Sequence, residues 1–487
     1  TLNAGALSLG NAAALGTGTL TVAGPGSLDT STALTLNNAL SLSNALTLVG
    51  SNDLSLNGAI TGGGRLIKNG TTTLSLSGNS SFTGGTTLNA GTLSVGSNTA
   101  LGTGSLSLGG AATLTGTGNY SLANAVQLGA NALSIDNAGN SLSLGGIITG
   151  SGSLNALGTG TLTLAGNNSY AGGTTLNAGT LRLGSDAALG TGALTVAGAA
   201  TLDTTANRVV ANAIALNAQL GLTGTNNLTL NGALSGTGAL LKDGSATLTL
   251  NGNSSGYSGT TALNAGTLVV GNANALGSGQ LNVNGAAALD SSGALSLANA
   301  VQLNANLNVL GGHDLGLTGA LTGTGALLKN GAGTLSLSGT NSYTGGTTLA
   351  SGRLNVGSNS ALGIGALSVT GASNLNSTAA TSILANAVNL GSTLTVDGSN
   401  ALFLNGALSG SGRIIKNDSG TLGLNAASTF SGGTTLNAGS LLLGNANALG
   451  TGALSVTGAA TLDTNQALSL ANNVALGAAL TLNGSQD

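Results

Sequence analysis

The chain has 487 residues, of which 4% are charged, and its formal net charge is −3. These values exclude a basic nucleic-acid-binding face and an acidic tail. Hydrophobic residues reach 41%, too many for a disordered chain, but aromatic residues are 1% and Met, Trp and Cys are absent. We therefore expect a packed core of Leu, Val, Ile and Ala. The 86 glycines lack the three-residue period of collagen, and no apolar run is long enough to span a bilayer as a helix.

An internal repeat of about 87 residues runs through the whole chain. The phrase TTLNAGTL and its variants recur at successive offsets of 86, 88, 87, 86 and 87 residues, with the second Thr position at Thr1, Thr87, Thr175, Ala262, Thr348 and Thr435. We predict one continuous domain whose repeats are 1–86, 87–174, 175–261, 262–347, 348–434 and a partial 435–487.

Within each repeat, apolar and small polar residues alternate with a period of two, as in 92–95, 105–108 and 161–164. This alternation is typical of β-strands. Gly, Asn and Ser clusters close each strand. The sequence contains no helical pattern for the crossover connections that a flat parallel sheet would need. We predict an all-β, right-handed parallel β-solenoid (β-helix) with about four turns per repeat and roughly 22 turns in all.

The period also predicts which side chains face the core of the second repeat. Residues that we expect to point inward are Leu88, Leu93, Val95, Leu106 and Leu108. Residues that we expect to point outward are Thr92, Ser94, Ser105 and Ser107.

The run GTGALLKNGAGTLSLSGTNSYTGGTTLASGRLNVGSNSALG, from Gly323 to Gly363, resembles the autotransporter-associated β-strand repeat of bacterial passenger domains. Related runs occur at 64–70, 239–244 and 412–418, whereas 153–160 lacks the lysine of the others. The resemblance implies a right-handed β-helix at the outer surface of a Gram-negative cell, commonly carried there by a C-terminal barrel, and a role in adhesion or biofilm formation. We identify neither a signal peptide nor barrel strands in the sequence.

Five of the seven aromatic residues occupy one position of the repeat, just before a Gly turn: Phe82, Tyr170, Tyr257, Tyr343 and Phe430. We expect these rings to lie along one side of the solenoid and to cover the gap beside the Gly turn. The alternative is a docking stripe for a sugar or for a neighbouring copy.

Lysines also recur at one position of the repeat: Lys68, Lys242, Lys329 and Lys416. We expect them to be solvated turn lysines that discourage lateral strand pairing, and binding of a polyanion is the alternative.

The acidic residues that recur once per repeat are expected to cap turns: Asp29, Asp203, Asp290 and Asp463. They are too far apart for paired-carboxylate catalysis. His313 stands beside Asp314 in a turn sequence, and we expect a structural role for it. Arg182 and Asp203 are 21 residues apart, and Asp186 and Arg208 are 22 apart, so each pair is expected to form an exposed ion pair between neighbouring turns.

The sequence therefore predicts a structural or adhesive extracellular protein that is not an enzyme, with no cofactor, no metal site and no nucleic-acid partner. Its expected partners are further copies of itself, a cell-surface receptor or a glycan. A filament subunit is the alternative. An ice-binding solenoid, suggested by outward Thr arrays at 71–73 and 161–163, and a polysaccharide-active enzyme are weaker alternatives.

The two ends of the chain lead to one further prediction about its assembly. Thr1 begins inside the repeat without a start Met, and the last strand, 479–486, is still in phase. Uncapped terminal turns expose unpaired backbone groups. We therefore expect either a longer parent chain or end-to-end stacking of subunits.

Overall fold

The computed structural model describes residues 1–484 and consists of short strands, β1 to β61, with no helix among these residues. The strands pair in parallel and stack as a β-solenoid of about 24 turns, slightly more than the roughly 22 predicted. Contacts group the chain into two compact units, Thr1–Leu240 and Leu241–Asp487. They are called the N-terminal and C-terminal units below. The predicted all-β solenoid is confirmed, and no helix of the described residues could cross a membrane.

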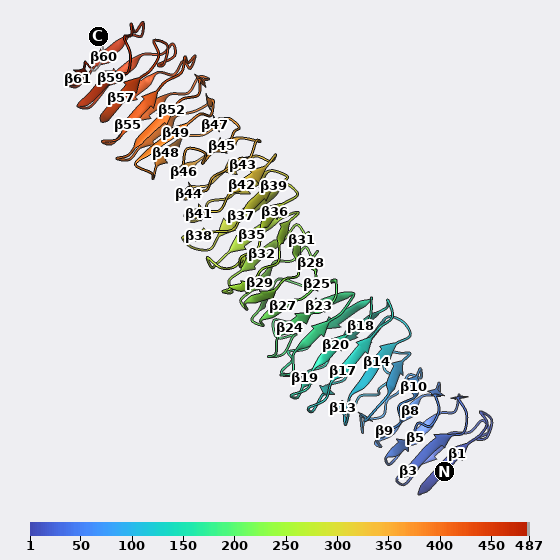
Figure 1. Cartoon of the computed structure of the whole chain (residues 1–487). Coiled ribbons are helices and arrows are strands. Elements are labelled where there is room, and N and C mark those ends of the chain that lie inside the picture. Colours follow the sequence, from blue (N-terminus) through green and yellow to red (C-terminus); the bar gives the residue numbers. More distant parts are fainter. Residues whose placement is uncertain (485–487) are drawn as a thin grey trace. The chain divides into compact units, whose positions relative to one another are not determined.

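Each turn of the solenoid takes about 20 residues, because small side chains and glycines allow tight corners between short strands. In the N-terminal unit, Leu66 pairs with Thr86, which pairs with Leu106 one turn later. Figure 1 shows the strands of each unit stacked side by side in this way.

One complete sheet of the N-terminal unit has eight strands: β1 (Gly5–Leu9), β3 (Gly26–Thr30), β6 (Leu46–Leu48), β9 (Leu66–Lys68), β11 (Thr86–Leu88), β13 (Leu106–Leu108), β16 (Val126–Gln127) and β19 (Ile148–Thr149). Another sheet of this unit includes β10 (Thr73–Leu76), β12 (Thr92–Val95), β14 (Ala112–Gly116), β17 (Leu133–Asp136), β20 (Leu154–Ala156) and β22 (Thr174–Leu176).

The C-terminal unit contains a complete ten-stranded sheet: β38 (Leu295–Leu297), β41 (Leu315–Leu317), β44 (Thr334–Leu337), β46 (Gly352–Val356), β48 (Ser373–Ser377), β51 (Leu394–Asp397), β54 (Ile414–Lys416), β56 (Thr434–Leu436), β58 (Leu454–Val456) and β60 (Val474–Leu476). Its six-stranded sheet contains β49 (Thr381–Leu384), β52 (Ala401–Leu404), β55 (Thr421–Leu424), β57 (Gly439–Leu443), β59 (Ala460–Thr464) and β61 (Leu480–Asn483). The predicted last strand extends beyond β61 to residues outside the described part of the chain.

The core is a set of aliphatic columns that run from turn to turn. All five residues predicted to point inward in the second repeat are buried, which confirms the register. Of those predicted to point outward, Ser94 is buried as well. It lies between Ser75 and Thr115 of the neighbouring turns, and these cover its small side chain.

Candidate functional site

The recurring aromatic side chains lie inside the solenoid, not on its surface. Phe82, Tyr170, Tyr257, Tyr343 and Phe430 are each 0% exposed. A Cβ atom on Gly102, one turn after Phe82, would lie 2.8 Å from the Phe82 ring, so the ring fills the space beneath this glycine. The ring therefore covers a gap beside a Gly turn. The docking-stripe alternative is corrected, because rings that pack inward offer no face to a ligand.

Hydroxyl groups anchor the tyrosines of this position. The Oη atom of Tyr170 lies 2.5 Å from Thr174 Oγ1, and that of Tyr343 lies 2.5 Å from Thr347 Oγ1. Tyr257 donates instead to the carbonyl of Thr260 at 2.8 Å. Burial raises the pKa of Tyr170 and Tyr343 to about 12, and the bond to the threonine opposes this only in part.

The recurring lysines are also buried, so the expectation of solvated turn lysines is wrong. Their exposed fractions are 1%, 3%, 0% and 1% for Lys68, Lys242, Lys329 and Lys416. The register explains this: Lys68 takes an inward position between Leu48 and Leu88 of the adjacent turns. Its aliphatic stem therefore belongs to a core column, and only its amine needs polar partners.

Backbone carbonyl groups supply those partners. Lys329 Nζ donates to the carbonyls of Asn330 and Gly331 at 2.8 Å each and to that of Ser351, one turn later, at 3.3 Å. We call this arrangement the lysine cage: an amine with carbonyls of the two residues that follow the lysine and of a residue in the next turn.

The other three lysines keep parts of the same cage. Lys416 Nζ donates to the carbonyls of Asn417, Asp418 at 2.8 Å and Ala438 at 3.5 Å. Lys242 Nζ donates to those of Gly244 and Ala265, the latter at 3.1 Å. Lys68 Nζ donates to the carbonyl of Gly70 at 2.5 Å.

Burial lowers the pKa of all four lysines, in Lys416 to about 8. For Lys416 the charges of Asp418 and Asp397 oppose the effect of burial without cancelling it. An amine that is buried and bonded to the backbone cannot bind a polyanion at the surface, so this alternative is not supported.

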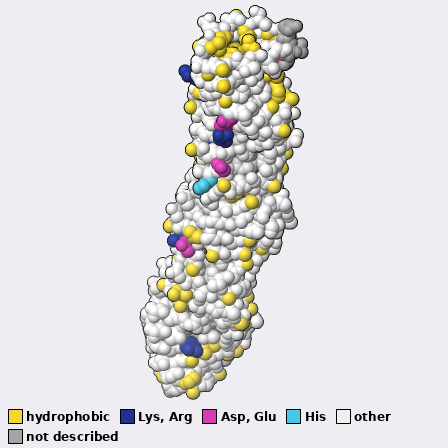
Figure 2. All heavy atoms as spheres, turned by 90° about the vertical axis from the view of Figure 1, so that its left-hand side faces the viewer, with side chains coloured by type: hydrophobic (Ala, Val, Ile, Leu, Met, Phe, Trp, Pro, Cys, Tyr) yellow, Lys and Arg dark blue, Asp and Glu magenta, His cyan; other side chains and the backbone are white. Residues whose placement is uncertain are grey.

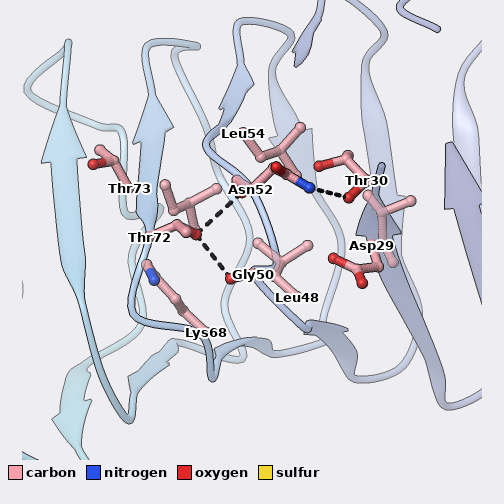
Figure 3. Close-up of a pocket in the computed structure, with 11 residues that line it drawn as sticks. Asp29, Thr30, Leu48, Gly50, Asn52, Leu54, Lys68, Thr72 and Thr73 are labelled. Atoms are coloured by element: carbon pink, nitrogen blue, oxygen red, sulfur yellow. Dashed lines mark hydrogen bonds between the residues drawn. The ribbon is translucent and has the colours of Figure 1, made fainter. Parts of the chain in front are cut away.

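Figure 3 shows the surroundings of Lys68, where a cavity of about 10 Å³ remains. Thr72 Oγ1 donates to the carbonyls of Gly50 and Asn52 at 3.0 and 3.1 Å, and the Asn52 amide donates to the Thr30 carbonyl at 2.6 Å. This volume is near the minimum that can hold a single water molecule. The cavity is therefore too small for any organic ligand.

A column of asparagines was missed by the sequence analysis. Asn386 Nδ2 donates to the carbonyls of Gly363 and Gly365, at 3.1 and 2.6 Å, in the preceding turn. The same pair of bonds recurs at every repeat, from Asn38, Asn124, Asn212, Asn299, Asn386 and Asn472. Their 86-to-88-residue spacing was the available signal.

The recurring aspartates lie in strands, and two of them accept hydrogen bonds from a turn of the next rung. Asp29 lies in β3 and accepts bonds from Ser51 N and Oγ, at 3.1 and 2.7 Å, in a turn of the next rung. Its hydrogen bond from the Ser51 hydroxyl lowers its pKa. Asp290, in β37 (Ala287–Ser291), accepts likewise from Gly312 N at 3.1 Å. These two carboxylates therefore stabilise a turn from the adjacent strand.

The remaining members of this series also lie in strands. Asp203 lies in β25 (Ala200–Thr204) and pairs with Arg182, as predicted, at 3.0 Å. Asp463 lies in β59 and accepts from Thr464 N at 2.8 Å. The predicted pair of Arg208 and Asp186 also forms, at 3.9 Å.

One ion pair was not anticipated because it spans two turns. Arg353 donates to both oxygens of Asp397 at 2.7 Å, and Asn374, on the intervening turn, donates to Asp397 Oδ2 at 2.8 Å. Figure 2 shows how sparse such charges are on the visible face of the molecule.

His313 Nδ1 lies 2.9 Å from the Ser291 carbonyl, and Asp314 accepts from Thr334 N at 2.7 Å. No group of three metal-ligating side chains occurs in residues 1–484. Both His313 and Asp314 thus bond to the backbone.

The C-terminal unit carries an open groove of about 560 Å³. Its floor includes outward positions of successive turns: Ala288, Asn308, Leu328 and Thr348. None of its lining residues titrates, so the groove can bind through shape and neutral hydrogen bonds but offers no acid or base.

A family model for the passenger-associated-transport-repeat matches residues 66–95, 154–183, 240–270, 327–356 and 414–443. Each match spans the lysine-cage position and the aromatic position of one repeat. Neither a curated protein nor a solved structure matches the chain. The recurring buried cluster thus lies within a known repeat, because five segments of the chain match the passenger-associated-transport-repeat.

Proposed function

We propose that this chain is a structural and adhesive segment of an extracellular passenger protein on a Gram-negative cell. The observation that carries the proposal is the burial of the residues that recur. The lysines, the aromatic residues and the asparagines all bond or pack within the solenoid, so selection on the repeat acts on the scaffold.

The passenger-associated-transport-repeat supports the cellular setting, because it is named for passengers that are exported. A repetitive solenoid adds stability turn by turn and needs no disulfide, which suits an extended extracellular scaffold. The nearly neutral surface also allows close approach to other surfaces with little electrostatic repulsion.

A filament subunit is the second candidate, favoured by the low charge, which would allow copies to pack side by side. Electron micrographs of purified chain would separate the two: single particles support the passenger segment, and ordered bundles support the filament.

The proposed role is tested by deleting whole repeats from the chain displayed on cells. Removal of 175–261 or of 262–347 keeps the register, so either variant should fold and shorten the segment by one repeat. If the segment is a scaffold, both deletions should change attachment of cells to a surface to a similar small extent.

A matched control is a full-length variant, within one residue of the wild-type length, in which one repeat replaces the other. Loss of attachment after one deletion only, restored by that repeat alone, would instead assign binding to a specific repeat. No change in attachment after removal of the whole chain would contradict an adhesive role.

A further inference from the structure

The second repeat lacks the lysine of the cage and has Ala156 in its place. Ala156 pairs with Ile135 and Leu176 of the adjacent turns, as Lys68 pairs with Leu48 and Leu88. Ala156 is 4% exposed, so its position lies in the interior like that of the lysines. The chain therefore offers a natural comparison between a cage with its amine and a cage without it.

One carbonyl of the cage and a second carbonyl beside it keep their places when the lysine is absent. In the third repeat, a Cβ atom on Gly266 would lie 2.7 Å from both Gly244 O and Lys242 Nζ, and 2.6 Å from Ala246 O. In the second repeat, a Cβ atom on the equivalent Gly179 would lie 2.5 Å from Gly158 O and 2.4 Å from Gly160 O. The same two oxygens thus converge beneath the same glycine.

Glycine is required at this place for two reasons. Gly179 has φ +69° and Gly266 has φ +71°, which side chains rarely adopt. A side chain there would also occupy the space that the amine fills in the third repeat. Recurrence of this glycine in the second repeat, beside Ala156, keeps that space free of side-chain atoms.

Asn137, in the preceding turn, is the polar side chain nearest to the empty lysine position. Its Nδ2 donates to the carbonyls of Asn140 and Thr161 at 2.5 and 2.9 Å. Its Oδ1 turns toward Gly158, 2.0 Å from where a Cβ atom would lie, and therefore adds an oxygen beside the cage. Among residues 1–484, no group donates a hydrogen bond to Gly158 O.

We propose that the cage of the second repeat binds a small monovalent cation, potassium or ammonium, through the carbonyl oxygens of Gly158 and its neighbours. The site keeps Gly158 O, the counterpart of the Gly244 carbonyl that accepts from Lys242, and Gly160 O and Asn137 Oδ1 lie beside it. All three are hard oxygen ligands. Rings of backbone carbonyls are ligands for potassium in other proteins. A single positive charge fits, because the cage in the other repeats holds the single charge of one ammonium group.

The test uses the whole chain and compares KCl and NH4Cl with tetramethylammonium chloride at equal ionic strength. Tetramethylammonium is too large for a space that holds one amine. At a potassium concentration three times the dissociation constant, amide exchange in 154–180 should slow about fourfold, by the factor 1 + [K⁺]/Kd. Thallium(I), a spectroscopic substitute for potassium, should bind with a stoichiometry of one.

Two substitutions should change the number of bound cations in opposite directions. Ala156→Lys should supply an internal amine and abolish both thallium binding and the potassium effect, while Ala156→Met controls for filled volume. Lys329→Ala should create a second site and raise the thallium stoichiometry to two. Equal exchange in the three salts, with no thallium bound to the wild-type chain, would overturn the proposal. Binding that survives in Ala156→Lys would overturn it as well.

Discussion

Tyr170 and Thr174 join their hydroxyl groups at 2.5 Å inside the N-terminal unit, four residues apart and on either side of a Gly turn. Where the aromatic residue is phenylalanine, the bond cannot form. Thr86, which follows Phe82, and Thr434, which follows Phe430, have buried Oγ1 atoms without a partner. The two versions of one position thus differ by a single hydrogen bond.

Phe82→Tyr should therefore stabilise the chain, because it supplies a partner to the buried Thr86 hydroxyl. We expect the free energy of unfolding to rise by about 1 kcal/mol, and Tyr170→Phe to lower it by a similar amount. Denaturant unfolding measures both. Thr86→Val in the Phe82→Tyr background is the control, and a gain that persists in this double variant would show that the hydroxyl pair is not its cause.

Lys416 should make stability depend on pH in the alkaline range. Its pKa falls from 10.5 to about 8 on folding, so the unfolded chain holds this proton more tightly than the folded chain. The free energy of unfolding therefore rises between about pH 8 and 10.5, by on the order of 3 kcal/mol, and the cost of the buried charge is fully present below pH 8.

Lys416→Met, which keeps the stem but carries no charge, is the comparison. The difference in unfolding free energy between the two chains should shrink or change sign across this window. A difference that does not vary with pH would show that the carbonyl cage fully compensates the burial of the ammonium.

Asn386→Ala should leave the carbonyls of Gly363 and Gly365 without their amide donor. Because both bonds connect one turn to the turn before it, we expect a loss of about 2 kcal/mol that is confined to the adjacent turns. Hydrogen exchange of peptides around 360–390 measures this. Asn405→Ala, at an exposed asparagine, is the matched control and should change exchange little.

Arg353 and Asp397 should be coupled more strongly than the predicted surface pairs. The carboxylate of Asp397 is 8% exposed and accepts two bonds from Arg353 and one from Asn374. A double-mutant cycle with Arg353→Met and Asp397→Asn should give about 1 to 3 kcal/mol of coupling, against less than about 1 kcal/mol for Arg182 and Asp203. Equal coupling in the two cycles would contradict the importance of burial.

The fold could be predicted from the sequence because its signals are local and repeated. The alternation around Leu93 and the glycine-rich corners determine strands and turns, and the recurrence fixes how they stack. The solenoid and the inward register of the second repeat followed from these signals alone.

The interior polar groups could not be predicted in the same way. Lysine is usually exposed, and only the register shows that Lys68 occupies a leucine-like position whose amine reaches turn carbonyls. The aromatic side chains turn inward because Gly102 and its equivalents leave room for a ring, which depends on packing in the next turn. Arg353 reaches Asp397 two turns away, a contact that spacing by one turn does not suggest.

The pairing of Leu66 with Thr86 and of Thr86 with Leu106 has a consequence for how the chain folds. Partners are always about 20 residues apart, so the typical loop to be closed stays constant however many repeats are added. Contact order, the mean separation of partners relative to chain length, therefore falls as repeats are added, while each pairing still has to close a loop of about 20 residues. Each folded turn presents a strand edge to the next segment of the chain. Folding that starts at one turn can therefore spread to its neighbours, turn by turn.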